Sequence, residues 1–352
     1  MKVGFVRRGY SPTGGAEAYL LRLADGVAAR GHTPVLLTSK EWPADRWPNE
    51  YIVRIDGRSP LQFSKGIQRA ATGCDVVFSL ERIAACDVYR AGDGVHRAWL
   101  ERRAKFEPAW KRWTRWTNGK HRELLELEAE MFARRAARFV IANSRMVRDE
   151  IVAHYGYPAG NIEVIPNGYD SPLVAENLRA ARRAELGLAD GDFVALFAGS
   201  GWERKGLETA IAAVKGMRGV KMLVAGKGRP PREVPVGVTF LGPQSNLQPD
   251  FAAADVFVLP TIYDPFSNAC LEALAAGLPV LTTSANGFSE IISNGEHGTV
   301  FEPGDAGALR QALEFWRERA AEARSRCREL ASRYSVAENT RRTLEVISRA
   351  VR

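Results

Sequence analysis

Two carboxylates, Asp264 and Glu272, have the type and spacing that most directly suggest chemistry. A helix is predicted to begin between them near Ser267, so Asp264 lies in the preceding loop and Glu272 about one turn inside the helix. The N–H groups that open a helix lack intrahelical acceptors, so those of Ser267 and Asn268 are expected to bind an oxyanion or sugar hydroxyls. An acid at a helix start is often only a cap, but two carboxylates around a helix that follows a strand are less often so.

Two cations, Arg204 and Lys205, follow a glycine-rich turn in the stretch Ala198–Gly206. The turn comes after a predicted strand, and ligands of open parallel sheets collect at the carboxyl ends of strands. Two fixed cations there would neutralise a diphosphate as it leaves. The alternative is a pair of solvated charges in the first turn of a helix. That position is unfavourable for cations, which favours the diphosphate interpretation.

Gly14 and Gly15 follow the first predicted strand and precede a predicted helix, Ala16–Ala29. Glycines at such a point allow an anion to approach the backbone closely. The spacing is not G-x-G-x-x-G, which weakens a nicotinamide interpretation. A plain turn that binds nothing stays open as the alternative.

Short apolar runs alternate along the chain with segments of helical period. Continuous apolar strands separated by amphipathic helices indicate parallel sheets covered on both faces, so the predicted fold class is α/β, doubly wound. The predicted strands are Val3–Val6, Pro34–Thr38, Asp75–Leu80, Phe139–Ala142, Ile162–Ile165, Phe193–Phe197, Met222–Ala225, Val238–Leu241, Val256–Leu259 and Val280–Thr282.

The chain of 352 residues predicts two domains. Pro166 and Asn167-Gly168 interrupt the pattern after a strand, so the boundary is placed between residues 168 and 169. The predicted domains are 1–168 and 169–335. A final helix, about 336–352, is expected to pack back on the first domain.

The composition is that of an ordinary globular protein, which excludes disordered, collagen-like and disulfide-scaffold classes. The formal net charge of +8 indicates an anionic partner. Most of this excess lies in residues 97–122, which hold nine basic and two acidic side chains. No apolar run approaches the length of a membrane span. A cytoplasmic location is expected.

The same stretch, residues 97–122, carries tryptophans at helical spacing with arginines between them. Aromatic and basic side chains together favour contact with the headgroups of an anionic membrane, here the inner face of the cytoplasmic membrane. They would equally suit binding of a phosphorylated saccharide acceptor. The alternative is a solvated helix whose tryptophans pack on the first domain. The residues concerned are Trp110, Arg112, Trp113, Arg115 and Trp116.

These motifs together resemble the GT-B glycosyltransferases of retaining family 4, most closely those that act on the lipopolysaccharide core. The resemblance is densest over residues 196–206 and 255–300, and the family's acid-x7-Glu motif corresponds to Asp264 and Glu272. Its first position is usually Glu, so Asp264 is a shortened variant. The resemblance implies two Rossmann-like domains that face each other across a cleft. The first would bind the acceptor and the second the nucleotide-sugar donor.

The resemblance also implies roles for individual residues. Asp264 would face the donor sugar, Glu272 would hold the ribose hydroxyls, and His96 would act on the acceptor side with Asp93 nearby. The alternative for His96 is a hydrogen-bonded structural histidine. The remaining residues implied to contact the sugar or the diphosphate are Gly14, Gly15, Arg204, Lys205, Phe266, Ser267, Asn268 and Ala269.

The implied reaction needs no metal and no cofactor. Metal-dependent glycosyltransferases of the other large architecture use a D-x-D motif, and here Asp190-Gly-Asp192 is interpreted as a turn before a strand. Arg204, Lys205 and helix N–H groups would stabilise the leaving group instead. With Glu272 at the ribose, no nucleophile for a double displacement is evident, which favours front-face attack.

The resulting hypothesis is transfer of a hexose-type sugar, with retention, from a nucleotide-diphosphate sugar to an envelope glycan such as the lipopolysaccharide core. A UDP-sugar is the expected donor. Two alternatives stay open: a nucleotide-sugar epimerase of the same architecture, and a nucleic-acid-binding protein that exploits the positive charge. Against the second, the basic residues follow no recognised nucleic-acid-binding platform, so no nucleic-acid partner is expected.

Overall fold

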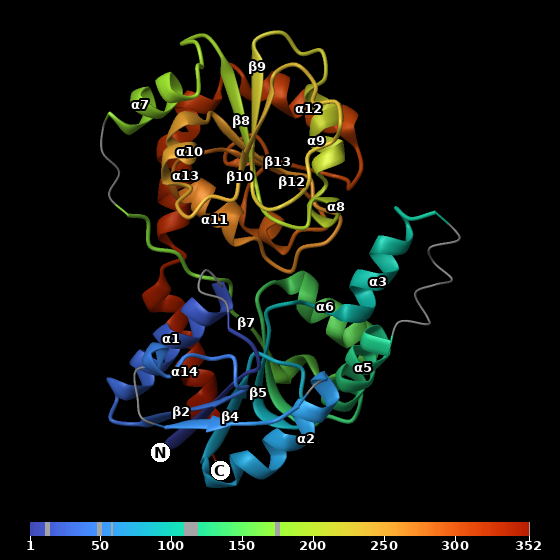
Figure 1. Ribbon diagram of the computed structural model, residues 1–352, viewed down its shortest axis with the longest axis vertical. Helices are drawn as coiled ribbons and strands as arrows, with labels where there is room; N and C mark the ends of the chain where they lie inside the picture. Colours follow the sequence, from blue (N-terminus) through green and yellow to red (C-terminus); the bar gives the residue numbers. More distant parts are fainter. Residues whose placement is uncertain (11–14, 48–50, 58, 109–118, 173–176, 352) are drawn as a thin grey trace. The chain divides into compact units, whose positions relative to one another are not determined.

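A computed structural model describes residues 1–10, 15–47, 51–57, 59–108, 119–172 and 177–351 (Figure 1). The chain divides into two compact units. Unit 1 contains Met1–Pro166 and Ala337–Arg352, and unit 2 contains Asn167–Val336. Each unit is built on one parallel sheet, so the prediction of an α/β fold with two Rossmann-like domains is confirmed.

The sheet of unit 1 has seven strands in the order β3-β2-β1-β4-β5-β6-β7, and all paired neighbours run parallel. Parallel strands need crossover connections, which the helices supply. The strands are β1 (Lys2–Arg7), β2 (Thr33–Thr38), β3 (Ile52–Arg54), β4 (Val76–Ser79), β5 (Cys86–Ala91), β6 (Ala137–Ala142) and β7 (Ile162–Val164).

Helices cover both faces of this sheet (Figure 1). The last helix belongs to unit 1, where Leu344, Ile347 and Ala350 join the core formed with Leu20 and Leu23. The helices are α1 (Gly15–Ala28), α2 (Pro60–Ala70), α3 (His96–Ala104), α5 (Gly119–Glu128), α6 (Arg145–Tyr155) and α14 (Val336–Arg349).

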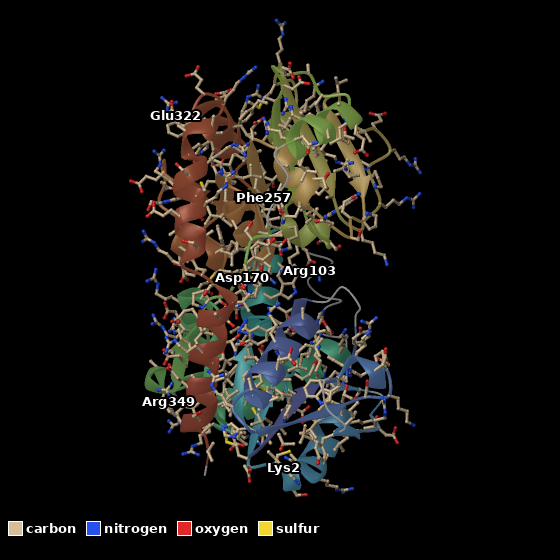
Figure 2. All side chains as sticks on the ribbon, turned by 90° about the vertical axis from the view of Figure 1, so that its left-hand side faces the viewer. Lys2, Arg103, Asp170, Phe257, Glu322 and Arg349 are labelled. Atoms are coloured by element: carbon tan, nitrogen blue, oxygen red, sulfur yellow. The ribbon has the colours of Figure 1, made fainter. Side chains whose placement is uncertain are left out.

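Unit 2 repeats the plan with six parallel strands in the order β10-β9-β8-β11-β12-β13. Its strands are apolar, as is typical of parallel sheets covered on both faces. Phe257 of β11, for example, is fully buried in the core of the unit (Figure 2). The strands are β8 (Phe193–Ala198), β9 (Val220–Ala225), β10 (Val238–Gly242), β11 (Val256–Leu259), β12 (Val280–Thr283) and β13 (Gly298–Phe301). The helices are α7 (Leu178–Glu185), α8 (Trp202–Lys205), α9 (Leu207–Val214), α10 (Gln248–Ala253), α11 (Asn268–Ala275), α12 (Ala306–Trp316) and α13 (Ala320–Ser332).

All ten strands predicted from the sequence are present, but β3, β5 and β13 were missed. β5 lies inside the sheet and is buried along its whole length, although it contains Asp87 and Arg90. The Asp87 carboxylate accepts a hydrogen bond from the N–H of Val77 at 2.8 Å, and the Arg90 guanidinium lies 3.9 Å from the ring centroid of Tyr19. These tertiary partners make burial of two charged residues tolerable, and no sequence window contains them.

Both sheets reverse their strand order at one point, between β1 and β4 in unit 1 and between β8 and β11 in unit 2. Ligands of open α/β sheets bind outside the carboxyl ends of the strands at such a point. A ligand is therefore expected at the loops after these four strands. Among the described residues, no helix has the length and apolar character required to cross a membrane.

Candidate functional site

The loop after β8 in unit 2 carries the two predicted cations. Gly201 precedes the short helix α8, and Gly206 follows it with a φ of 76°. A side chain at Gly206 would overlap the carbonyl oxygen of Pro260, so this turn requires glycine. Arg204 and Lys205 occupy the last positions of α8, not the first turn of a longer helix as predicted. The position of these cations is therefore not electrostatically unfavourable, because cations suit a helix C-terminus.

Lys205 and Asp264 form a buried ion pair at the switch point of unit 2. The Lys205 Nζ donates to Oδ2 of Asp264, and Nη1 of Arg204 lies 3.9 Å from the same oxygen. Arg204 also donates to the carbonyl of Tyr263 at 3.1 Å. The fold thus brings together three of the predicted site residues, which come from the loops after β8 and β11.

Backbone hydrogen bonds fix Asp264 between two loops. Its N–H donates to the carbonyl of Ala285 at 2.9 Å, and its own carbonyl accepts from the N–H of Gly287 at 2.9 Å. Ala285 and Gly287 follow β12, so the loops after two neighbouring strands are joined at the carboxylate. A group held on both sides in this way is preorganised for a ligand.

The start of α11 differs from the expectation for Ser267. Its hydroxyl caps the helix by accepting from the N–H of Cys270 at 3.4 Å, and its own N–H donates to Oδ1 of Asn286 at 3.4 Å. The prediction that the Ser267 N–H is free for an oxyanion is therefore wrong. Asn268 is exposed and Ala269 is half-buried. Both lie in the first turn of α11, where backbone N–H groups have no intrahelical acceptors.

Asn286 holds the loops of this region together through its side chain. It is fully buried, its Oδ1 accepts from the N–H of Phe288 at 3.1 Å, and its Nδ2 donates to Oγ1 of Thr282 at 2.9 Å. The side chain of Phe266 packs edge-on against Phe288, with ring centroids 5.8 Å apart. Phe266 is thus a core residue, and only its backbone belongs to the helix start.

Glu272 lies one turn into α11 and is partly buried. Burial raises the pKa of this carboxyl to about 7, because the charged form is poorly solvated there. Burial, followed by the charge of Glu272, raises the pKa of Tyr169 to about 12. The Tyr169 hydroxyl accepts from Nε2 of Gln248 at 2.8 Å. Sequence reasoning missed Tyr169, which lies at the domain boundary rather than in a motif.

In unit 1, charged side chains that are far apart in the sequence meet at the carboxyl ends of the strands. Arg7, the last residue of β1, pairs with Glu17 of α1 and with Glu81 after β4, each at 3.0 Å. Gly15 is the first residue of α1. Gly14 lies outside the described residues. The first turn of α1, which begins at Gly15, therefore takes part in a charge cluster that contains two acids as well as a cation.

His96 is the first residue of α3, and Asp93 is exposed in the turn before it. Nε2 of His96 lies 3.0 Å from Nδ1 of His121 on α5. Burial, followed by the charge of Arg82, lowers the pKa of His96 to about 4. His96 is therefore neutral at physiological pH, so it can exchange hydrogen bonds with a ligand but cannot supply a positive charge.

Glu128, which the sequence did not single out, fixes the start of α3. Its carboxylate is fully buried and accepts from the N–H groups of His96 and Arg97, from Nε of Arg82 at 3.0 Å and from the hydroxyl of Tyr155 at 2.8 Å. A carboxylate at a helix N-terminus satisfies donors that the helix leaves open. Glu128 thus positions His96.

The basic stretch 97–122 is described only in part. Trp110, Arg112, Trp113, Arg115 and Trp116 lie outside the described residues. In the part that is described, Arg97, Arg102 and Arg103 pair with the carboxylates that follow: Glu101 at 3.3 Å, Glu150 at 2.8 Å and Glu107 at 2.5 Å. Some of the local positive charge is thus neutralised within unit 1.

The D-x-D stretch lies in a turn before β8. The Asp192 carboxylate accepts from the N–H of Ala189 at 2.9 Å, and the Asp192 carbonyl accepts from Arg183 at 2.8 Å. Asp192 precedes the amino end of β8, whereas Lys205 follows its carboxyl end. Because these are opposite ends of one strand, the interpretation of this stretch as a structural turn is consistent with the fold.

This chain resembles known proteins in both sequence and structure. The model of glycosyltransferase family 4 matches residues 13–171, and that of the glycosyl transferases group 1 matches residues 192–317. A probable transglycosylase of Burkholderia thailandensis is 30% identical over 89% of this chain and 86% of its own length. The lipopolysaccharide glucosyltransferase WaaG of Escherichia coli is 25% identical over 89% of this chain and 88% of its own length.

Solved structures show the same fold over nearly the whole chain. A crystal structure of WaaG, described as a glycosyltransferase involved in lipopolysaccharide biosynthesis, matches with a TM-score of 0.80 and 22% identity, covering 98% of this chain and 99% of its own. Anabaena HepE in complex with UDP-glucose matches with a TM-score of 0.77 and 19% identity, covering 99% of both chains.

Proposed function

Because this chain belongs to the glycosyltransferases of family 4, we propose that it moves a hexose-type sugar from a nucleotide-diphosphate sugar to an envelope glycan, with retention of configuration. The observation that carries this proposal is the group formed by Lys205, Arg204 and Asp264 beside the start of α11. The proposed donor is a UDP-sugar, in keeping with the complex of HepE. The proposed acceptor is a saccharide of the lipopolysaccharide-core type, because WaaG is named a lipopolysaccharide glucosyltransferase and the Rhizobium meliloti relative LpsE a lipopolysaccharide core biosynthesis glycosyltransferase.

The donor would lie across the switch point of unit 2. Lys205 and Arg204 would hold its diphosphate, with the N–H groups of Asn268 and Ala269 at the start of α11 as further donors. The backbone of Phe266, which precedes the helix, would add a contact. Glu272, one turn further, would accept hydrogen bonds from the ribose hydroxyls. Ser267 would contribute through its cap, which sets the direction of α11.

Charge neutralisation explains why Lys205 is paired before the donor arrives. Its ammonium is mostly buried, and an unpaired charge there would be costly, so Asp264 compensates it in the free enzyme. When the diphosphate enters, Lys205 gains a second anionic partner. Asp264 would then face the sugar, where its carboxylate stabilises positive charge that develops at the anomeric carbon.

We propose front-face displacement without a metal ion. The bond between the anomeric carbon and the diphosphate oxygen breaks, the diphosphate leaves with the electron pair, and the acceptor oxygen attacks from the same side. The acceptor proton passes to a departing phosphate oxygen. Lys205 and Arg204 supply the positive charge that stabilises the leaving group. His96, neutral and oriented by Glu128, would hold hydroxyls on the acceptor side together with Asp93.

Peripheral contact with the inner face of the cytoplasmic membrane stays a prediction from the composition of residues 97–122. A nucleotide-sugar epimerase is the remaining alternative within the same architecture. Family membership favours transfer over nucleic-acid binding, which the net charge alone had left open.

The test is product analysis with radiolabelled UDP-glucose and purified lipopolysaccharide core acceptors. The expected result is a labelled acceptor that carries an α-linked sugar, as in the donor, with UDP released in equal amount. Label found only in an altered nucleotide sugar, with no acceptor required, would establish the epimerase instead. A β-linked product would refute retention, and loss of activity on chelation of divalent metals would refute metal independence.

A further inference from the structure

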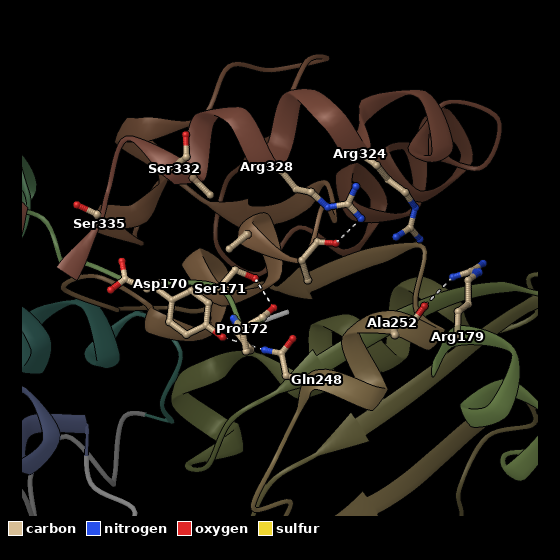
Figure 3. Close-up of a pocket in the computed structure, with 14 residues that line it drawn as sticks. Asp170, Ser171, Pro172, Arg179, Gln248, Ala252, Arg324, Arg328, Ser332 and Ser335 are labelled. Atoms are coloured by element: carbon tan, nitrogen blue, oxygen red, sulfur yellow. Dashed lines mark hydrogen bonds between the residues drawn. The ribbon is translucent and has the colours of Figure 1, made fainter. Parts of the chain in front are cut away.

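Unit 2 contains a pocket that neither Lys205 nor Asp264 lines, with a volume of about 710 Å³ (Figure 3). Its walls are the segment Tyr169–Pro172, helices α7, α10 and α13, and the carboxyl end of α11. None of the residues assigned above to the diphosphate or the sugar lines it. Its volume is in the range that binds small ligands. The proposed function gives this pocket no role.

Three arginines line the pocket: Arg179 on α7, and Arg324 and Arg328 on α13. Arg324 and Arg328 are four residues apart, so they lie on one face of their helix, and both extend from it into the pocket (Figure 3). The acidic lining residue is Asp170, whose Oδ1 accepts from the N–H of Val336 at 3.0 Å. The lining is therefore cationic within a half of the chain that is close to neutral.

Carbonyl groups at helix ends hold the guanidinium groups in place. Arg324 donates to the carbonyl of Ala254 at 2.8 Å, and Arg328 to that of Ala276 at 3.3 Å. Helix-end carbonyls fix the orientation and compensate the charge only in part, and each guanidinium has five N–H donors, so donors are left for a ligand. Asp255 is the nearest counter-charge, but it pairs with Arg179 at 2.6 Å and lies 3.9 Å from Arg324. Burial and the neighbouring Arg179 lower the pKa of Arg324, as expected where cations outnumber their partners.

The other end of the pocket offers groups suited to hydroxyls. Gln248 donates through Nε2 to the Tyr169 hydroxyl at 2.8 Å. Its Oε1 is buried, and within the described part of the chain it has no hydrogen-bond partner. A buried acceptor without a donor is costly, and a ligand hydroxyl would satisfy it. Ser332, four residues after Arg328, adds a hydroxyl on the α13 side.

We propose that this pocket binds a small phosphorylated sugar or polyol, with its phosphate on Arg324 and Arg328 and a hydroxyl donating to Gln248. Arginine forks match phosphate geometry, and the two ends of the pocket match the two parts of such a molecule. None of the residues assigned to the donor lines this pocket, although Tyr169 on its wall is close enough to feel the charge of Glu272. The proposal does not depend on the proposed reaction.

The experiment is isothermal titration calorimetry of the full-length protein with glucose 6-phosphate. Inorganic phosphate and glucose, the two halves of that molecule, are titrated separately for comparison. The titrations use the Lys205→Ala variant as well as the unmodified protein, because the donor site also attracts phosphate. We expect glucose 6-phosphate to bind both proteins alike, and more tightly than either half. Absence of binding, or loss of binding in Lys205→Ala, would overturn the proposal.

Two substitutions then locate the ligand. Arg328→Gln removes one charged donor from an exposed position and is expected to weaken binding of glucose 6-phosphate about tenfold. Ser332→Asp places a carboxylate one turn from Arg328 and is expected to weaken it at least as much. Arg326→Gln, an exposed arginine of α13 that does not line the pocket, is the matched control and should leave binding unchanged. Equal affinities in all three variants would refute the site, and a melting temperature measured for each checks that it is folded.

Discussion

Two carboxylates, Glu128 in unit 1 and Asp264 in unit 2, are both buried beside cations near the carboxyl edge of a Rossmann-like sheet, yet their partners differ. Glu128 receives donors from His96, Arg97, Arg82 and Tyr155, which engage both of its oxygens. Asp264 has both nearby cations on Oδ2 alone. A carboxylate saturated by protein donors holds the structure together, whereas one paired with a partly exposed cation leaves binding capacity for a ligand.

The largest effect is expected for Glu128→Ala. It leaves the Arg82 guanidinium and two helix N–H groups without their buried acceptor, so the free energy of unfolding should fall by about 3–5 kcal/mol. Urea denaturation measures this loss. Glu126→Ala, an exposed position on the same helix, is the control and should change stability by less than about 0.5 kcal/mol. Equal stabilities of the two variants would remove the distinction between the carboxylates.

The complementary change, Lys205→Met, should damage activity more than stability. Loss of a preorganised charge at the leaving group is expected to lower kcat/KM about 100-fold or more. Transfer of radiolabelled sugar measures the effect, with Lys215→Met, an exposed lysine of the same unit, as the control. Unchanged transfer in Lys205→Met would show that the ion pair with Asp264 is purely structural.

Glu272→Gln tests the pH dependence of unit 2. The carboxyl has a pKa of about 7 in the folded protein and 4.5 in the unfolded chain, so between these pH values only the folded protein keeps the proton. The free energy of unfolding therefore falls as the pH rises from about 4.5 to 7 and stays lower above that. The glutamine variant should lack this slope and be about 2 kcal/mol more stable than the parent at pH 8, by urea denaturation. A parent protein whose stability is flat from pH 5 to 8 would contradict the raised pKa.

The same ionisation should affect donor binding in the opposite direction. An ionised Glu272 accepts two ribose hydroxyls, so the KM for the donor is expected to decrease as the pH rises through 7. In Glu272→Gln the KM should be higher and independent of pH over this range. A pH-dependent KM that persists in the variant would assign the titration to another group.

The smallest effect is expected for Asp192→Ser. The substitution removes an acceptor for the Ala189 N–H in an exposed turn, so stability should fall by less than about 1 kcal/mol and transfer should be unaffected. A large loss of activity in this variant would reopen the D-x-D stretch as a metal site.

Sequence patterns located unit 2 better than unit 1 for a physical reason. The residues of α11 lie next to one another in the chain, and the helix was predicted to begin near Ser267, where it does begin. The groups around His96 come from Arg82, His121, Glu128 and Tyr155, and only folding brings them together. β5 was missed because Asp87 and Arg90 conceal a buried strand.

The sequence by itself determined the α/β class, the order of most strands and helices and the motif that marks the family, because hydrophobic period and turn residues act locally. Tertiary structure decided which groups have partners. It engaged the Ser267 N–H with Asn286, paired Lys205 with Asp264, raised the pKa of Glu272 and gathered arginines around a pocket of unit 2. Hydrogen bonds, burial and charge pairing depend on distances between segments far apart in the chain, and only the folded chain sets those distances.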